Sequence, residues 1–239
     1  MNASGNIYGL LENEVDTHVM KNMEWGAVAY LLQSKYGKYG NADFTGANKE
    51  IYQNKSDTYI TGMSNGTPST STTGTLVAYN VEGTGTGAST TGNVYGIYDM
   101  SGGAWEYVMG VIKDNTSNGN PMSGNSDAYN SGFEGYIYNS NNYKLISGRT
   151  FPESKYYDLY DFGTTCNDDA AYARAKTGDA TTETKGWYGD YAGFAYGNGP
   201  WFVRGGSHGS DTGSGVWAFN SHYGDSNAYY AFRPVLVQK

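Results

Sequence analysis

The sequence predicts an α+β fold with a small, mostly antiparallel sheet, two helices and long irregular loops. Three observations indicate this class: two segments have helix signals, the strand-like segments gather in the second half of the chain, and long Gly-, Ser-, Thr- and Asn-rich stretches separate them. With 239 residues the chain can bury a core of its own. We therefore expect residues 1–239 to form a single domain.

The first helix is expected from Val19 to Lys35. Asp16 and Thr17 precede it as candidate N-caps, and Gly37 follows it as a stop signal. Apolar residues at steps of three and four predict its buried face: Val19, Met20, Met23, Ala27, Val28, Leu31 and Leu32. A second, short helix is expected from Asn167 to Lys176, because acidic residues open that segment and basic residues close it.

Five segments have the composition of strands. Gly96–Met100 and Ala104–Met109 flank a tight Ser-Gly-Gly turn, and three more candidates lie near the C-terminus: Trp201–Arg204, Val216–Phe219 and Phe232–Val237. Pro234 cannot donate to a sheet, so the last strand should lie at an edge or carry a bulge. Residues 38–93 and 113–142 show no periodicity and are expected to be irregular.

Composition excludes several classes of protein. The net charge is −8 without any cluster of Lys or Arg, which argues against nucleic acid as a partner. No apolar run approaches the length of a membrane span, so we expect no membrane insertion by this segment. The 24 Tyr, 8 Phe and 5 Trp indicate a core that relies on aromatic side chains. The polar start at Met1 has no signal peptide and is typical of a trimmed chain, so an N-terminal anchor is expected to be missing.

The stretch from Ser207 to Ala231 has the composition of a binding loop. It contains five Ser, four Gly, three Tyr and two of the three His, but no Lys, Glu, Gln or Met. Tyr provides a stiff amphipathic contact surface, and Ser, Gly and Asn provide adaptable hydrogen bonds, as in antibody paratopes. By composition alone, an ordinary polar surface loop explains the stretch equally well.

Three motif blocks resemble the formylglycine-generating-enzyme superfamily. The run GIYDMSGGAWEYV at Gly96–Val108 is similar to its G-L-Y-D-M-x-G-N-V-W-E-W-V signature, and Lys21–Leu31 is similar to its W-x-x-A-x-A-Y helix. The pair Arg204–Ser207 and Phe232–Pro234 is similar to its closing R-G-G-S and G-F-R strands. The resemblance implies a C-type-lectin-type fold, in a superfamily that contains both enzymes and non-enzymes.

An enzymatic function is not expected. The copper-dependent enzymes of this superfamily use two neighbouring Cys near the C-terminus, whereas Cys166 is the only cysteine here and is expected to be a structural or half-buried thiol. The iron-binding branch uses a His-rich helix motif, but His18 is isolated and is expected to help begin the first helix. Ser207, His208 and Asp211 are too close in sequence for the geometry of a catalytic triad. We expect no cofactor.

A calcium site is a further alternative, because lectin-type domains often hold one. The candidate ligands all have side-chain oxygens: Asp114, Asn115, Asp127, Asp168 and Asp169. They lack the D-x-D-x-D-G spacing, and Gly103 stands where the family has Asn. Solvated loop acids are the favoured interpretation, and no metal site is expected.

The chain resembles the non-enzymatic variable proteins of diversity-generating retroelements more closely. Mutagenesis at template adenines in such systems yields Ser, Gly, Asn, Asp, Tyr, His, Thr, Ala, Phe or Val, but not Lys, Glu, Gln, Met or Trp. Residues 207–231 obey this rule except at Trp217, which lies in a candidate strand. Some gut-bacterial relatives with a similar K-N-x-E-W-G-A-V-A-Y-L helix begin with a type IV pilin segment.

The resemblance predicts a receptor or adhesin, displayed outside a bacterial cell on a pilus-like anchor or on a phage tail, that binds a protein or glycan ligand on another cell surface. Its ligand contacts are expected within the variable segment, with the tyrosines as main contacts: Ser207, His208, Ser210, Asp211, Thr212, Ser214, Asn220, Ser221, His222, Tyr223, Asp225, Ser226, Asn227, Tyr229 and Tyr230. Arg204, Trp217, Phe219 and Phe232 are expected to be scaffold. Two alternatives stay open: a formylglycine-generating-type enzyme and a fixed carbohydrate-binding lectin. The identity of the ligand and the oligomeric state also stay open.

Overall fold

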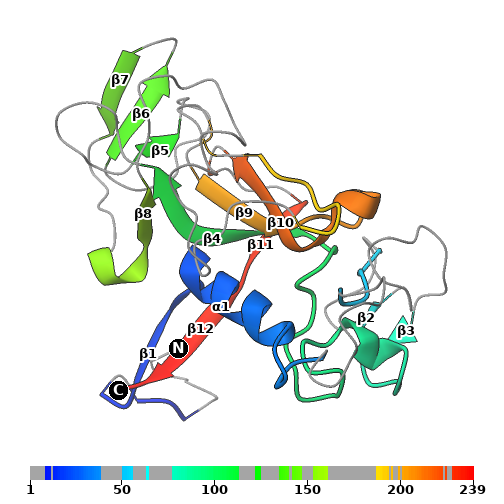
Figure 1. Ribbon diagram of the computed structural model, residues 1–239. Coiled ribbons are helices and arrows are strands. Elements are labelled where there is room, and N and C mark those ends of the chain that lie inside the picture. The colour runs from blue at the N-terminus through cyan, green and yellow to red at the C-terminus, as the bar shows by residue number, and fades with distance from the viewer. Residues whose placement is uncertain are drawn as a thin grey trace.

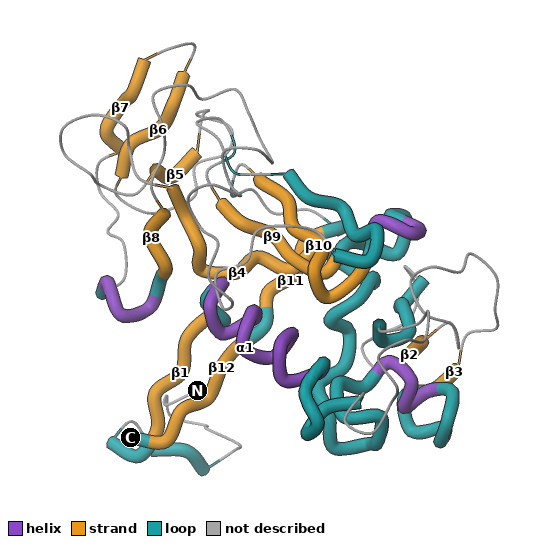
Figure 2. Tube along the Cα trace, viewed as in Figure 1, coloured by secondary structure: helices purple, strands orange, loops and turns teal. Residues whose placement is uncertain are grey.

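The computed structural model describes residues 9–11, 13–38, 50–55, 63–64, 77–112, 122–124, 135–139, 142–146, 153–160, 187–193, 195, 199, 201–222, 224 and 228–239. The described part is α+β, with one α-helix and strand pairings that are mostly antiparallel. Loops and turns occupy much of the chain between these elements (Figure 2). The coarse fold class predicted from the sequence is therefore confirmed.

The central sheet has five strands (Figure 1). Its strand order is β10-β9-β4-β11, and β8 pairs with the far end of β4. Strand β9 is antiparallel to β4 and β10, whereas β8 and β11 run parallel to β4. The strands are β4 Trp105–Ile112, β8 Asp158–Tyr160, β9 Trp201–Gly205, β10 Gly215–His222 and β11 Tyr230–Phe232.

Smaller elements surround this sheet. The first and last described strands pair antiparallel into a ribbon that extends away from it, β1 Val15–Val19 with β12 Pro234–Gln238 (Figure 1). A two-stranded sheet is formed by β2 Met63–Ser64 and β3 Val77–Ala78. A three-stranded sheet consists of β5 Met122–Gly124, β6 Gly135–Asn139 and β7 Asn142–Ile146. The short 3₁₀ turns are η1 Gly85–Ala88, η3 Ser154–Tyr156 and η5 Asp211–Gly213.

The helix α1 spans Asn22–Leu32 and is shorter than predicted. The candidate caps Asp16 and Thr17 lie in β1, because Val15–Val19 pairs with β12 over five positions. Pairing with a strand more than 200 residues away in sequence outweighs the local cap signals. The Glu24 side chain accepts a hydrogen bond from the Lys21 backbone N–H at 2.8 Å and so closes the true N-terminus.

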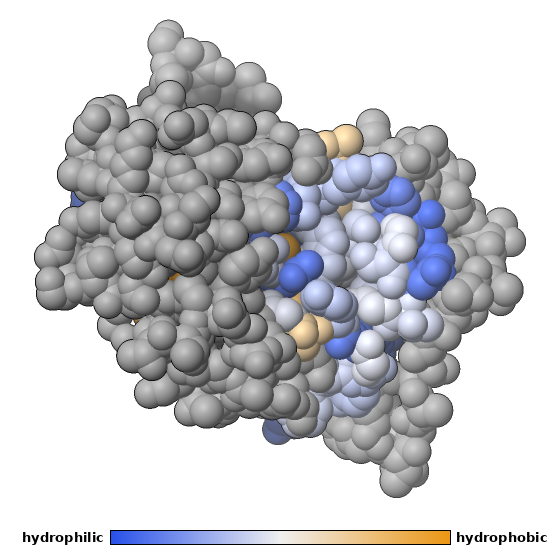
Figure 3. Space-filling model, turned by 90° about the horizontal axis from the view of Figure 1, so that it is seen from above, coloured by the Kyte–Doolittle hydropathy of each residue, from blue (hydrophilic) through white to orange (hydrophobic). Residues whose placement is uncertain are grey.

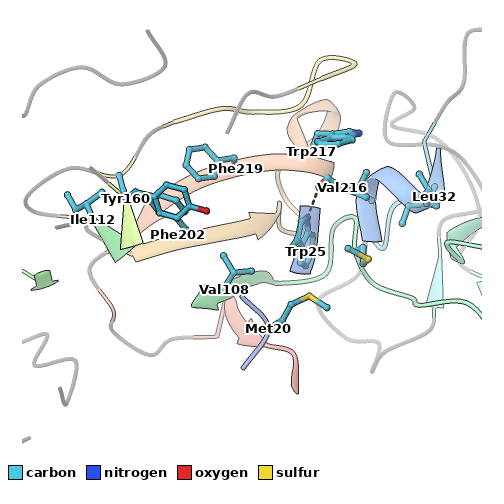
Figure 4. Packing of buried hydrophobic residues seen from close by; sticks show 14 residues of the cluster. Met20, Trp25, Leu32, Val108, Ile112, Tyr160, Phe202, Val216, Trp217 and Phe219 are labelled. Carbon is cyan, nitrogen blue, oxygen red and sulfur yellow. Dashed lines mark hydrogen bonds between the residues drawn. The ribbon is translucent and has the colours of Figure 1, made fainter. Parts of the chain in front are cut away.

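The predicted buried face of the helix was also wrong in part. Met23 and Leu31 are exposed, whereas Asn22, Trp25 and Ala29 are buried with Leu32. The helix is oriented by Asn22 and Trp25, whose polar atoms find partners on the sheet, as described below. Among the buried residues of the core, Trp25 and Leu32 pack with Val216 and Trp217 (Figure 4).

Side-chain alternation gives the central sheet two different faces. Val108, Phe202 and Phe219 belong to the large cluster that α1 covers. Their neighbours in sequence point the opposite way, and Trp105, Val203 and Ala218 form a second cluster with Tyr107 and Tyr230. The second face of the sheet is therefore the one on which aromatic residues of β4 and β11 meet.

Three strand predictions are confirmed and two are corrected. The confirmed strands are Trp201–Arg204, Val216–Phe219 and Ala104–Met109, the last of which lies at residues 105–112 in the structure. Residues 96–100 form a loop instead, because Asp99 has a φ of +59°, which lies outside the strand region. After this loop Gly102 forms a β-bridge with Asn54, and its N–H donates to the Gly205 carbonyl oxygen at 3.0 Å. A Cβ at Gly102 would lie 2.3 Å from the Asn54 carbonyl oxygen, so this contact requires glycine.

The last predicted strand is divided in two at Arg233. Residues 230–232 join the central sheet as β11, and residues 234–238 pair with β1 as β12. Within the described residues β12 pairs with β1 alone, so the edge position predicted from Pro234 is confirmed. The irregular stretches are less uniform than predicted, because β2 and β3 lie in residues 38–93, and β5 and β6 lie in residues 113–142.

Several predictions fall outside the described residues. They are the second helix Asn167–Lys176, the thiol Cys166, and the calcium candidates Asp114, Asn115, Asp127, Asp168 and Asp169. His18 lies in β1 rather than in the helix, yet its Nε2 is 2.9 Å from a Glu24 carboxylate oxygen in the first helical turn. Among the described residues, no helix is both long and apolar enough to cross a membrane.

Candidate functional site

Buried polar contacts join the three motif blocks. The Arg204 Nε donates to the Asn22 side-chain oxygen at 2.8 Å, which ties β9 to α1. The Trp25 indole N–H donates to the Val216 carbonyl oxygen at 2.7 Å, which ties α1 to β10 (Figure 4). These contacts hold the strand before the predicted variable segment, and the β10 strand within it, against the same helix.

An ion pair closes the other end of the segment. The Arg233 guanidinium makes two hydrogen bonds to the carboxylate of Glu106, one of them from Nε at 2.8 Å. Glu106 is buried on β4, and burial raises its pKa while the charge and hydrogen bonds of Arg233 lower it. The pair fixes the chain where β11 ends and β12 begins.

The scaffold predictions hold for three of four residues. Arg204, Trp217 and Phe219 are buried, and the Arg204 guanidinium lies 4.9 Å from the Phe219 ring centroid. Phe232 was predicted to be scaffold as well, but 65% of its surface is exposed. Phe232 is the last residue of β11, and the last two residues of that strand are exposed. The Phe232–Pro234 motif block therefore begins on the surface rather than in the core.

The first half of the variable segment is a loop held by its own serines. The Ser210 hydroxyl accepts from the Ser207 backbone N–H at 3.1 Å and lies 3.0 Å from the Ser207 hydroxyl. The Ser214 hydroxyl donates to the Ser207 carbonyl oxygen at 2.8 Å, and Ser214 is buried. Ser214 was predicted to contact ligand, but in this conformation its side chain supports the loop.

Thr212 and Asp211 are exposed, and Asp211 forms an ion pair with Lys55 at 3.1 Å.

The buried Ser214 and the exposed Thr212 should differ in how much they contribute to the free energy of unfolding. Ser214→Ala removes a buried hydrogen bond and should lower the free energy of unfolding by about 1–2 kcal/mol. Thr212→Ala alters an exposed side chain and should stay within about 0.5 kcal/mol of the parent. Urea denaturation of both variants measures the difference. Equal stabilities would show that Ser214 does not support the loop.

The second half of the segment brings residues from two separated strands together. His222 on β10 and Tyr230 on β11 have ring centroids 3.9 Å apart. Tyr107 on β4 lies beside both, at 5.8 Å from the His222 ring and 5.4 Å from the Tyr230 ring, and its hydroxyl is hydrogen-bonded to His222 Nδ1. Asn220 is on the same side as Tyr107, because both pair in register with Val203.

The two halves of the segment touch through His208 and Tyr229. Their rings are stacked at 5.8 Å with an interplanar angle of 27°. His208 is held at its backbone, where its N–H donates to the Gly103 carbonyl oxygen at 2.7 Å. Tyr229 is 57% exposed, and its carbonyl oxygen accepts from the Trp105 N–H. We call Tyr107, His208, His222, Tyr229 and Tyr230 the aromatic face.

The remaining predicted contact residues divide into two groups. Ser221 and Asn220 are half-buried at the end of β10, where the Asn220 side-chain oxygen accepts from the Ser221 N–H. Four lie outside the described residues: Tyr223, Asp225, Ser226 and Asn227. Figure 3, seen from above, shows a described surface in which hydrophilic and near-neutral residues predominate.

Sequence reasoning missed two aromatic residues of this site. Tyr107 lies in the Gly96–Val108 motif block, from which no contact residue was predicted. It alternates with Glu106 and Val108, so strand periodicity could have placed it on the opposite face from the core. Tyr191 packs edge-on against Trp105 at 6.3 Å and is 50% exposed. No local pattern in residues 187–193 indicates that this segment returns to the sheet.

A buried acid pair fixes residues 187–193 to β10. One Asp190 carboxylate oxygen accepts from the Trp217 N–H at 2.9 Å, and the Asp190 side chain also hydrogen-bonds with Glu50. Burial raises the pKa of Glu50 to about 10, and the neighbouring Asp190 carboxylate adds to that shift. Burial also raises the pKa of Asp190 to about 7, although its hydrogen bonds oppose the shift. At neutral pH the Glu50 carboxyl group is therefore protonated.

The acid pair predicts a pH-dependent stability. Because both folded pKa values are raised above the unfolded ones, the contribution is complete below pH ~4 and is lost as pH rises through the folded values. Glu50→Gln mimics the protonated acid, so its urea denaturation midpoint should fall less between pH ~5 and ~9. Glu82→Gln, at an exposed position, is the matched control. Parallel pH profiles for parent and Glu50→Gln would contradict the assignment.

Comparison with known proteins adds no relative: no family model matches the chain, and no curated protein matches it. Among the described residues, no three His, Cys, Asp or Glu side chains are grouped so that they could hold a metal ion. The functional interpretation therefore depends on the motif blocks and on the geometry of the aromatic face.

Proposed function

We propose that this chain is a non-enzymatic ligand-binding protein, a receptor or adhesin, whose residues 207–231 are diversified by a retroelement. It would be displayed outside a bacterial cell or on a phage tail and would bind a protein or glycan on another cell surface. The C-type-lectin-type fold implied by the motif blocks is part of the same proposal, as is a single domain over residues 1–239.

One observation carries the proposal: the two halves of the segment meet on one surface. His208 contacts Tyr229, and His222 contacts Tyr230, although β9 and β4 separate the strands that bear His222 and Tyr230. A ligand on this surface would touch both halves at once. Changes at either half would then alter specificity within one site.

The buried contacts at the flanks support the division between fixed and variable residues. Arg204 before the segment and Arg233 after it each bind a partner in another block, Asn22 and Glu106. Trp217, the residue inside the segment that retroelement mutagenesis does not produce, is buried next to α1. Rigid strands can therefore hold the backbone while exposed side chains change.

The lectin-type fold gains support from the same contacts, because α1, β4, β9 and β11 carry the motif blocks and pack on shared clusters.

The nucleotide sequence around the gene tests diversification directly. We expect a near-identical template repeat of the codons for residues 207–231, with differences confined to template adenines. The codon for Trp217 should match the template. A template repeat with substitutions spread evenly over all four bases, or no repeat at all, would refute diversification and favour a fixed lectin.

A display library tests binding itself. Randomising exposed positions of the segment, such as Asp211, Thr212 and Tyr229, should leave most members folded, because each exposed change costs about 0.5 kcal/mol or less. Selection against a defined immobilised protein should then enrich binders. A control library randomised at the buried positions Ser214, Gly215 and Trp217 should lose folded display. A folded library that yields no binder to any protein or glycan probe would contradict the proposed function.

A further inference from the structure

Aromatic residues outside the variable segment border the aromatic face on two sides. Tyr191 precedes the segment and is 50% exposed, and Phe232 follows its last residue and is 65% exposed. Tyr107, on β4, lies between them in the sheet. Because mutagenesis of residues 207–231 would not reach these positions, they would be the same in every variant.

The backbone of Tyr191 is hydrogen-bonded to two residues of the predicted variable segment. Its backbone N–H donates to the Gly213 carbonyl oxygen at 3.0 Å, and its carbonyl oxygen accepts from the Phe219 N–H at 2.9 Å. A Cβ placed on Gly193 would lie 3.0 Å from the Asn220 side-chain oxygen and 3.3 Å from the Tyr191 hydroxyl, so these two polar groups are neighbours. The Tyr191 ring therefore stands beside Asn220, at the β10 side of the face.

The turn that presents Tyr191 is held in an unusual conformation. Tyr188 has φ +57° and Gly189 has φ +100°, and the Asp190 N–H closes the turn on the Trp187 carbonyl oxygen at 2.9 Å. A positive φ at a tyrosine costs free energy, so surrounding contacts must hold it. The buried Asp190 carboxylate provides such a contact through the Trp217 N–H. The turn, the buried Asp190 and the two backbone hydrogen bonds to Gly213 and Phe219 thus hold Tyr191 in place.

Phe232 lies on the opposite side of the face. It pairs in register with Tyr107 in the parallel β4–β11 pair, so both side chains point to the same side of the sheet. Tyr230, two residues earlier, also points there and packs against Tyr107 at 5.4 Å. The Phe232 side chain is entirely apolar. Because it is exposed, it places apolar surface next to the tyrosines of the segment.

We propose that Tyr191, Tyr107 and Phe232 form a constant aromatic frame that takes part in every ligand complex, and that the ligand is a folded protein surface. This inference rests on the proposed function. Tyr191 and Phe232 would contact the ligand directly, and Tyr107 would position His222 through its hydroxyl. The variable residues between them would then set specificity, while the frame supplies a shared apolar contribution.

The dimensions and composition favour a protein over a single sugar ring. The exposed residues around the face come from three separate parts of the chain: the turn that carries Tyr191, the His208 loop and β11. Exposed Tyr and Phe with few charges are typical of the centres of protein interfaces. The charged group described in the loop, Asp211, is paired with Lys55 at the margin.

The experiment uses binders selected from the display library described above, with immobilised lysozyme as a defined protein probe. Phe232→Ala and Tyr191→Ala are then introduced into several binders of unrelated variable sequence. Each change should weaken the Kd at least about tenfold in most of them. Tyr36→Ala, at an exposed tyrosine after α1, is the matched control and should leave the Kd unchanged. Circular dichroism of each variant checks that the fold is kept.

Three results separate the frame from the proposed function. Binders that keep their Kd after both Phe232→Ala and Tyr191→Ala would overturn the frame but leave diversification standing. A folded library that yields dextran binders but no lysozyme binders would overturn the protein ligand class. Tyr107→Phe, which removes only the hydroxyl, should weaken binders that retain His222 and spare binders that have lost it; equal effects on both sets would overturn the positioning role.

Discussion

Replacing Arg233 by Met is expected to lower the free energy of unfolding by about 3–5 kcal/mol, because it leaves the buried Glu106 carboxylate without its cation. The loss should be largest at neutral pH. Burial already raises the pKa of Glu106 against the opposing effect of Arg233, so without Arg233 the carboxyl group should protonate more readily in the folded state. The deficit should therefore shrink as pH falls toward ~4.

The double variant Glu106→Gln with Arg233→Met separates this cause from lost packing. Neutralising the carboxylate should recover a large part of the deficit at neutral pH and abolish its pH dependence. Asp211→Asn breaks an ion pair whose acid is 67% exposed, and should cost less than about 1 kcal/mol. Urea denaturation at several pH values measures all three. A deficit in Arg233→Met that is independent of pH would show that packing, not charge, dominates.

Trp25→Ala is the second change with a large expected effect, about 3–5 kcal/mol. Trp25 is fully buried between α1 and the sheet, and its indole N–H binds the carbonyl oxygen of Val216 on β10. The truncation opens a cavity in the main core and leaves that carbonyl oxygen unpaired. Since β10 carries His222 of the aromatic face, loss of this contact should also weaken binding.

Trp25→Phe tests the two contributions separately. It keeps most of the apolar volume but removes the donor, so about 1–3 kcal/mol of the loss should remain. Tyr36→Ala, at a residue with 75% of its surface exposed, should change stability by no more than about 0.5 kcal/mol. Denaturation followed by Trp fluorescence and by circular dichroism should give coincident transitions. If Trp25→Phe were as damaging as Trp25→Ala, the hydrogen bond rather than the cavity would dominate.

The local signals of the sequence predicted the elements whose partners lie nearby. The strands around Trp201–Arg204 and Val216–Phe219 follow from β-branched and aromatic runs between glycines. The helix was expected in the right place because its periodicity is local. Its start was misplaced, since Val15–Val19 pairs with a strand at the other end of the chain.

The candidate site was predictable in composition but not in geometry. The segment 207–231 stands out by its Tyr, Ser, Gly and His content, and its flanking arginines mark fixed blocks. Ser214 was assigned to the wrong side because a serine that braces its own loop has the same sequence signature as one that faces a ligand. Phe232 was expected to be buried because the strand signal does not indicate which side another element covers.

The coarse α+β fold class could therefore be predicted from the amino-acid sequence, and composition alone singled out residues 207–231 and the motif blocks on either side of them. The tertiary structure decided which residues of that segment share a surface and which other residues join them. The contacts His208–Tyr229 and His222–Tyr230 form because β10 and β11 lie on either side of β9 and β4, and Tyr191 reaches the same surface through the buried Asp190. Such contacts depend on strand order and on pairing between distant residues, which local sequence patterns do not specify.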